Sequence, residues 1–204
     1  MPAGNPSGPV GWRAQFGRFC GDVEGLAAVE AAFLAPVVLG FLGLAVFGGE
    51  GLSIQRKVTL ASRTVADLVG QATVTTTRSG AGAATLKQSD LDYYLSLSTL
   101  ILFPYDASGV QAELSEVQVA SGGGATATVI WSEGYNGGVA RPVGQIISID
   151  PSIVSAGAGY LLLGEAQYAY QPLNIWQSVG PFTISDSIFM APRSASQISI
   201  SWGQ

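Results

Sequence analysis

The sequence predicts an α+β protein in which a long N-terminal transmembrane helix continues as an amphipathic stem that packs on a small antiparallel β-sheet domain. Three observations lead to this fold class. Residues 26–49 are apolar except for one carboxylate, residues 54–72 repeat apolar side chains at helical spacing, and the chain beyond residue 105 is rich in glycine and β-forming residues. With 204 residues, the chain is long enough for one ectodomain of ordinary size beyond the membrane segment.

The apolar segment from Leu26 to Gly49 is long enough to span a bilayer. Its 24 residues would extend roughly 36 Å as a helix, and the hydrocarbon core is about 30 Å thick. Its Leu, Phe and Val residues together favour insertion by roughly 4 to 7 kcal/mol, which exceeds the cost of about 3 kcal/mol for Glu30. Two alternatives stay open: a buried helix of a soluble protein, and a cleaved secretory signal, to which Ala45-Val46-Phe47 is a poor match.

Composition excludes several kinds of chemistry. Cys20 is the single cysteine and the chain has no histidine, so an intramolecular disulfide, a thiolate metal site and catalysis by Ser-His-Asp or Cys-His groups are all excluded. From Gly70 onward, four basic residues face nine acidic ones, which argues against nucleic acid as a partner. We therefore expect no catalytic residue, no metal and no cofactor.

The start of the apolar segment carries a spaced motif. Residues 1–25 are rich in glycine and proline and are typical of a leader rather than a domain. After Gly25 come four apolar residues and then Glu30, at the head of a long apolar helix. The run from Gly25 to Ala31, followed by Leu34-Ala35-Pro36, resembles the start of the TadE/TadG-like family of pilin-like proteins (pseudopilins) of the tight-adherence (Tad) pilus system.

The resemblance implies processing and assembly. In that family a membrane prepilin peptidase cuts after the glycine, here between Gly25 and Leu26, and the glutamate, here Glu30, helps subunits enter a type IV pilus-like filament used for adhesion and surface attachment. The implied partners are the prepilin peptidase, other pilin or pseudopilin subunits, the pilus assembly machinery and the bacterial inner membrane. Two features differ from the common family pattern: Ala31 follows the glutamate where Phe is usual, and acidic residues precede the glycine.

The resemblance also implies an organisation along the chain. Residues 1–25 would be a class III-type leader that is cleaved, 26–49 a transmembrane helix, 50–72 the amphipathic helical stem, and 73–204 an extracytoplasmic α+β domain. The protein would be single-pass, with its C-terminal domain in the periplasm or on a cell-surface pilus. Charge bias alone does not favour this orientation, because more basic residues follow the segment than precede it; the resemblance decides it.

Glu30 and Pro36 each affect how the apolar segment behaves in a membrane. A carboxylate in a membrane helix is costly unless it is protonated or paired. The free α-amine of Leu26 in a neighbouring subunit could pair with Glu30, whereas the alternative is that Glu30 only reaches the headgroup layer. Pro36 leaves the carbonyl of Ala32 without its intrahelical donor, which predicts a helix kink.

The remaining elements follow from periodicity and turn signals. The stem should continue to about Gly70 and seat its apolar face on a sheet of the same chain. A polar linker, a helix capped by Ser89, a hairpin, a loop and two further strands should follow, over residues 73–85, 90–102, 110–120 with 125–133, 134–141, 160–170 and 182–192.

Two other functions remain open at this point. One is a permanently membrane-anchored extracytoplasmic binding module, with Trp131, Tyr135 and Trp176 as a stacking surface. The other is an extracytoplasmic enzyme with paired carboxylates, Glu113 with Glu116 or Asp90 with Asp92. Residues three apart on a strand point to opposite faces of a sheet, which argues against the first of these pairs.

Overall fold

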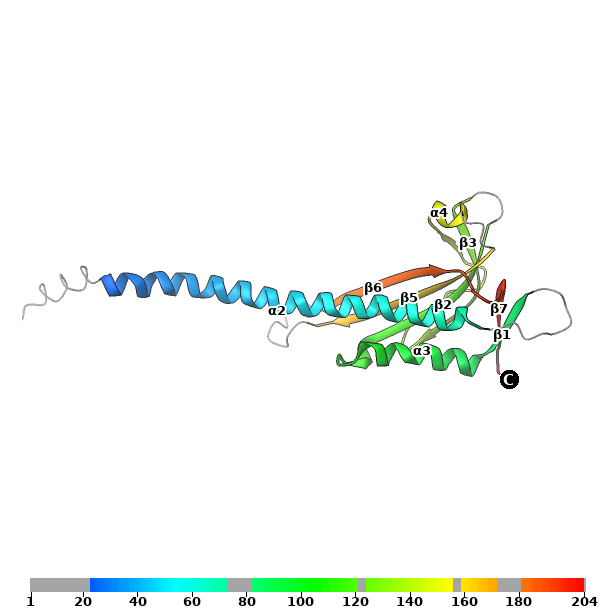
Figure 1. Ribbon diagram of the computed structural model, residues 1–204, viewed down its shortest axis with the longest axis horizontal. Helices are drawn as coiled ribbons and strands as arrows, with labels where there is room; N and C mark the ends of the chain where they lie inside the picture. Colours follow the sequence, from blue (N-terminus) through cyan, green and yellow to red (C-terminus); the bar gives the residue numbers. More distant parts are fainter. Residues whose placement is uncertain (1–22, 73–81, 121–123, 156–158, 172–180, 204) are drawn as a thin grey trace, which may run out of the picture. The chain divides into compact units, whose positions relative to one another are not determined.

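The protein is described here from a computed structural model, which covers residues 23–72, 82–120, 124–155, 159–171 and 181–203. The chain forms two compact units, Met1–Gly49 and Glu50–Gln204. Helix α2 runs from Val23 to Gly70 (Figure 1), so it supplies the described part of the first unit and the stem of the second. All of the predicted leader except its last three residues lies outside the described ranges.

Helix α2 is longer and more continuous than the sequence suggests. It passes through Pro36 and through the glycines at 48, 49 and 51 without a break, although glycine weakens helices. Its end at Gly70 is the predicted one. The kink at Pro36 stays a prediction.

The second unit contains a five-stranded antiparallel sheet in the order β4-β3-β2-β5-β6. Next to it, β1 and β7 pair in parallel as a separate two-stranded sheet (Figure 1). The element bounds, in chain order, are β1 Ala83–Lys87, α3 Gln88–Leu102, the 3-10 helix η1 Ala107–Gly109, β2 Val110–Val119, β3 Thr126–Tyr135, β4 Ile146–Ser148, α4 Pro151–Ser155, β5 Tyr160–Tyr170, β6 Phe182–Met190 and β7 Gln197–Ser201.

The stem packs on one face of the five-stranded sheet, as its periodicity predicts. Its buried side chains lie among those of β2 and β5, and include Ile54, Val58, Ala61 and Val65. The stem and the sheet approach closely at Gly164 of β5, where an added Cβ would lie 2.6 Å from the carbonyl oxygen of Ser62. Only glycine fits such a contact, so this position fixes how deeply the stem seats.

Helix α3 covers the same face beside the stem and is tied to it. Leu91 and Leu95 of α3 share a core with Val65 and Leu114. The ammonium of Lys57 donates to the carbonyl oxygens of Ile101, at 3.1 Å, and Phe103, at 2.7 Å. These are carbonyls at the C-terminal end of α3, which lack intrahelical donors, so a stem side chain caps the neighbouring helix.

Three local expectations are corrected by the fold. The predicted linker 73–85 contains the start of β1, and β4 and β7 were not expected at all. Helix α3 starts at Gln88, directly after β1, so its N-cap is Lys87 and Ser89 already lies in the first turn. The hairpin is confirmed as β2 paired with β3, with a register shift after Glu116 that leaves Ile130 as a bulge.

Candidate functional sites

The apolar helix of the first unit carries the motif residues. Among the described residues, α2 is the one helix long and apolar enough to cross a membrane. Its most apolar window of 18 residues has a mean hydropathy of 2.3, and none of that window is buried. An exposed surface of this kind is unusual for a soluble protein, which disfavours the alternative of a buried helix in a soluble core. It leaves the signal-sequence alternative open.

The predicted cleavage residues lie within the helix rather than before it. Because α2 begins at Val23, Gly25 and Leu26 are in its first turns, and a peptidase would have to act on a frayed helix end. A Cβ added at Gly25 would meet nothing within 4 Å. Gly40 has the same open surroundings and is therefore a matched control position.

Glu30 and Pro36 are exposed on the same helix. Across the described ranges, no hydrogen bond or ion pair to Glu30 is formed within the chain. Glu30 is therefore a carboxylate on an apolar helix for which the described residues provide no partner, a costly arrangement inside a membrane.

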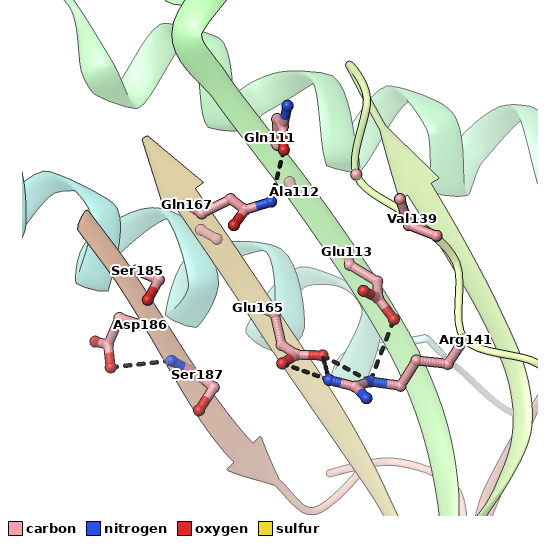
Figure 2. A pocket seen from close by; sticks show the side chains of 12 residues that line it. Gln111, Ala112, Glu113, Val139, Arg141, Glu165, Gln167, Ser185, Asp186 and Ser187 are labelled. Atoms are coloured by element: carbon pink, nitrogen blue, oxygen red, sulfur yellow. Dashed lines mark hydrogen bonds and ion pairs between the residues drawn. The ribbon is translucent and has the colours of Figure 1, made fainter. Parts of the chain in front are cut away.

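A second candidate site lies on the face of the sheet that points away from the stem. Here β2, β5 and β6 together with the loop after β3 line a hollow of about 430 Å³ (Figure 2), within the range of about 300 to 1,000 Å³ that is common for ligand pockets. We call it the outer groove, and its polar lining is Gln111, Glu113, Arg141, Glu165, Gln167, Ser185, Asp186 and Ser187.

An ion-pair cluster organises the outer groove. Arg141 Nε and Nη2 donate to the carboxylate of Glu165 at 2.7 to 2.9 Å. Arg141 Nε also lies 3.4 Å from Glu113 Oε1, which accepts hydrogen bonds from Ser115 and Ser132. Burial raises the pKa of Glu113, and the negative charge of Glu165 adds to this effect. The arginine therefore holds two carboxylates together that would otherwise repel each other.

The carboxylate pairs proposed from the sequence are not formed. Glu113 faces the outer groove, whereas Glu116 is completely buried and bonds to Trp131 and the strand β7. Asp90 and Asp92 are exposed residues of helix α3, where residues two apart do not face each other. Within the described ranges, no three side chains of ligand type come together to hold a metal ion.

The proposed aromatic stacking surface is also corrected. Trp131 is buried, and its indole N–H donates to the carbonyl oxygen of Ile198 at 2.6 Å and to Glu116 at 3.1 Å. Tyr135 packs against the core, and Trp176 lies outside the described residues. A buried tryptophan whose indole N–H is bonded within the chain is a core residue and is not available to stack on a ligand.

Sequence reasoning missed the outer groove because its parts are far apart in the chain. Glu113 and Glu165 become neighbours only through the antiparallel register of β2 and β5, and Arg141 reaches them from the loop after β3. A single sequence carries no signal for that register. Comparison with known proteins adds no identification: no family model, no curated protein and no solved structure matches the chain.

Proposed function

We propose that this chain is a minor pilin-like subunit in the assembly of a Tad-type type IV pilus, processed by a prepilin peptidase and assembled through its N-terminal helix. The observation that carries the proposal is the spacing of Gly25 and Glu30 at the head of an exposed apolar helix, within which Glu30 has no described partner. A bacterial inner-membrane location with a periplasmic domain follows from the same proposal.

In this proposal the helix acts in assembly and not in catalysis. Cleavage after Gly25 would leave a positive α-amine on Leu26, four residues before Glu30. In a low-dielectric environment the amine of one subunit and the carboxylate of the next attract each other strongly. Such a pair would fix the stagger between neighbouring helices, and the apolar surface would keep each subunit in the membrane until it is incorporated.

The mature N-terminus tests the processing step. Protein recovered from native envelopes should begin at Leu26 when analysed by N-terminal sequencing or intact mass. Gly25→Ala should raise the precursor-to-mature ratio on a blot, and Gly40→Ala should not, although both changes meet open space. Mature protein that retains its first 25 residues would refute the proposal.

A carboxylate substitution tests the assembly step separately. Glu30→Ala should leave the protein in the membrane fraction but reduce its recovery in sheared surface pili, because the partner amine is left unpaired. Val29→Ala, a neighbouring change on the same apolar helix, is the control. Wild-type recovery of the Glu30→Ala protein in pili would leave Glu30 without an assembly role.

The second candidate function is a permanently membrane-anchored extracytoplasmic binding module. The outer groove favours it, because its volume lies in the range common for ligand pockets and its side chains offer hydrogen-bonding groups to a polar ligand. An uncut chain in native envelopes, together with a ligand whose binding is lost on Arg141→Gln, would support this function instead.

A further inference from the structure

The first turn of the stem is fastened to the end of β5. The hydroxyl of Tyr170 donates to the carboxylate of Glu50 at 3.0 Å, and a Cβ added at Gly51 would lie 3.8 Å from the ring of the same tyrosine. Glu50 is the residue directly after the apolar segment 26–49. Tyr170 therefore marks the end of the folded unit that begins where the apolar segment stops, which we call the proximal end.

Two elements expose large apolar side chains at the proximal end. Phe182, the first residue of β6, pairs in register with Tyr170, on a neighbouring strand about 4.8 Å away, and it is 52% exposed. Leu52 of the stem is 60% exposed. It lies about 200° around the helix from Ile54, which packs against the sheet, so Leu52 points away from the sheet. Apolar surface is therefore open on both β6 and the stem.

A bilayer that surrounds the apolar segment would meet these two side chains. The headgroup and interfacial layer on each side of the hydrocarbon core is about 5 to 8 Å thick, and Leu52 lies only about 3 Å beyond Glu50 along the helix. Phe103 is more exposed, at 75%, but its carbonyl oxygen contacts Lys57, which is about 10 Å beyond Glu50. The layer therefore reaches Leu52 and the level of Phe182 and ends before the level of Lys57.

We propose that the proximal end of the folded unit rests in the headgroup layer of a lipid bilayer, with Leu52 and Phe182 as its lipid anchors. Leu and Phe are residues that interfacial segments insert at the boundary of headgroups and acyl chains, and removing them from water is favourable. The inference goes beyond the proposed function, because it requires only that the apolar segment spans a membrane. It holds equally for a processed pilin-like subunit and for a permanently anchored module.

Continuity with the apolar helix favours lipid as the occupant. Large apolar side chains of α2 are exposed from Leu26 to Val46, and none of its most apolar window is buried. Leu52 continues this exposed apolar surface past Glu50 on the same uninterrupted helix. A bilayer that covers the helix therefore extends to Leu52 without a change of partner, and Phe182 lies close to the same level.

Lipid quenching in the full chain tests the contact. Cys20→Ser removes the single cysteine, and a fluorophore is then attached to one new cysteine at a time, at Phe182→Cys or Leu52→Cys. Each protein is reconstituted in phosphatidylcholine vesicles with and without lipid that carries a nitroxide just below the headgroup. The labels at positions 182 and 52 should both lose most of their fluorescence to the nitroxide lipid, because both lie in the layer that holds the quencher.

Two further labels are the controls. Tyr93→Cys replaces an aromatic residue of α3 that is 61% exposed. It lies between Leu91 and Leu95, which share a core with Val65, about 22 Å beyond Glu50 along the stem, so its label should not be quenched. A label at Phe41→Cys, inside the apolar segment, should be quenched by a nitroxide placed deeper in the acyl chain, which confirms that the helix is inserted.

Each other outcome overturns the contact. Quenching at position 52 but not at 182 would show that the sheet stands clear of the lipid, and equal quenching at 93 and 182 would show adsorption of the whole unit. A label at 182 that is shielded from both nitroxide lipid and aqueous iodide would assign the surface to a second copy of the chain.

Thermal unfolding by circular dichroism checks that each labelled protein is folded. If Phe182→Cys lowers the melting temperature, Thr183→Cys, at the next and also exposed position of β6, replaces it with the same expected quenching. A label at position 41 that is not quenched would overturn the membrane span, and with it both this contact and the proposed function. Quenching at 41 without quenching at 182 or 183 refutes the contact alone.

Discussion

The buried carboxylate of Glu116 should make the stability of the folded domain depend on pH. Its side chain is completely buried, and its two oxygens accept from the backbone N–H of Ile198 at 2.6 Å and the indole N–H of Trp131 at 3.1 Å. Burial raises the pKa of Glu116 from 4.5 to about 7, although both hydrogen bonds favour the charged form. The perturbation that isolates this effect is Glu116→Gln, which keeps the shape and removes the titration.

The direction and size of this pH dependence follow from the linkage between proton binding and folding. Between pH 4.5 and about 7 the folded chain holds a proton on Glu116 that the unfolded chain has lost. The stabilisation is therefore fully present below pH 4.5 and is lost as the pH rises through about 7. Each pH unit changes the unfolding free energy by about 1.4 kcal/mol, so the full window accounts for at most about 3 kcal/mol.

Urea unfolding of the full chain in detergent, followed by tryptophan fluorescence at pH 5 and pH 7.5, measures this difference. The unfolding free energy of the wild type should be higher at pH 5 than at pH 7.5 by up to about 3 kcal/mol, after the corresponding difference in the Glu116→Gln variant has been subtracted. Asp90→Asn removes an exposed carboxylate and should keep the wild-type dependence. If Glu116→Gln shows the same pH dependence as wild type, Glu116 does not titrate in this window and the reasoning is refuted.

Two further substitutions probe how the stem is held. Lys57→Met should lower the unfolding free energy by about 1 to 2 kcal/mol, because it removes the two hydrogen bonds to the last carbonyls of α3; a urea midpoint equal to that of wild type would show that solvent replaces this cap. Gly164→Ala should destabilise by about 1 to 3 kcal/mol, because its methyl group would lie 2.6 Å from the Ser62 carbonyl oxygen. Gly159→Ala, which meets nothing within 4 Å, is the control, and equal melting temperatures for the two variants would contradict the close approach.

Local patterns were sufficient for the helices α2 and α3 and for most of the larger sheet. Residues Ile54 to Val65 repeat at helical spacing, and this period is enough to place the stem and its buried face. The hairpin of β2 and β3 and the strands β5 and β6 also follow from runs of β-forming residues between turns. These features depend on residues that are neighbours in the sequence.

Short elements were missed because their stability comes from distant contacts. β1 and β7 have five residues each and lie 110 residues apart in the chain. Ile198 of β7 has its N–H bound by Glu116 and its carbonyl by Trp131, so side chains of the larger sheet stand in for a neighbouring strand. Nothing in the local sequence of Gln197 to Ser201 indicates that arrangement.

The exposed apolar helix with Glu30 near its head follows from the order of the residues, because insertion depends on the sum of side-chain transfer energies along a continuous segment. The outer groove does not, because Glu113, Arg141 and Glu165 meet only after β2 and β5 have paired in one register and the loop after β3 has folded back over them. The sequence directly gives the chemical identity of each side chain, whereas the distance between charges is set by the register and packing of segments far apart in the chain.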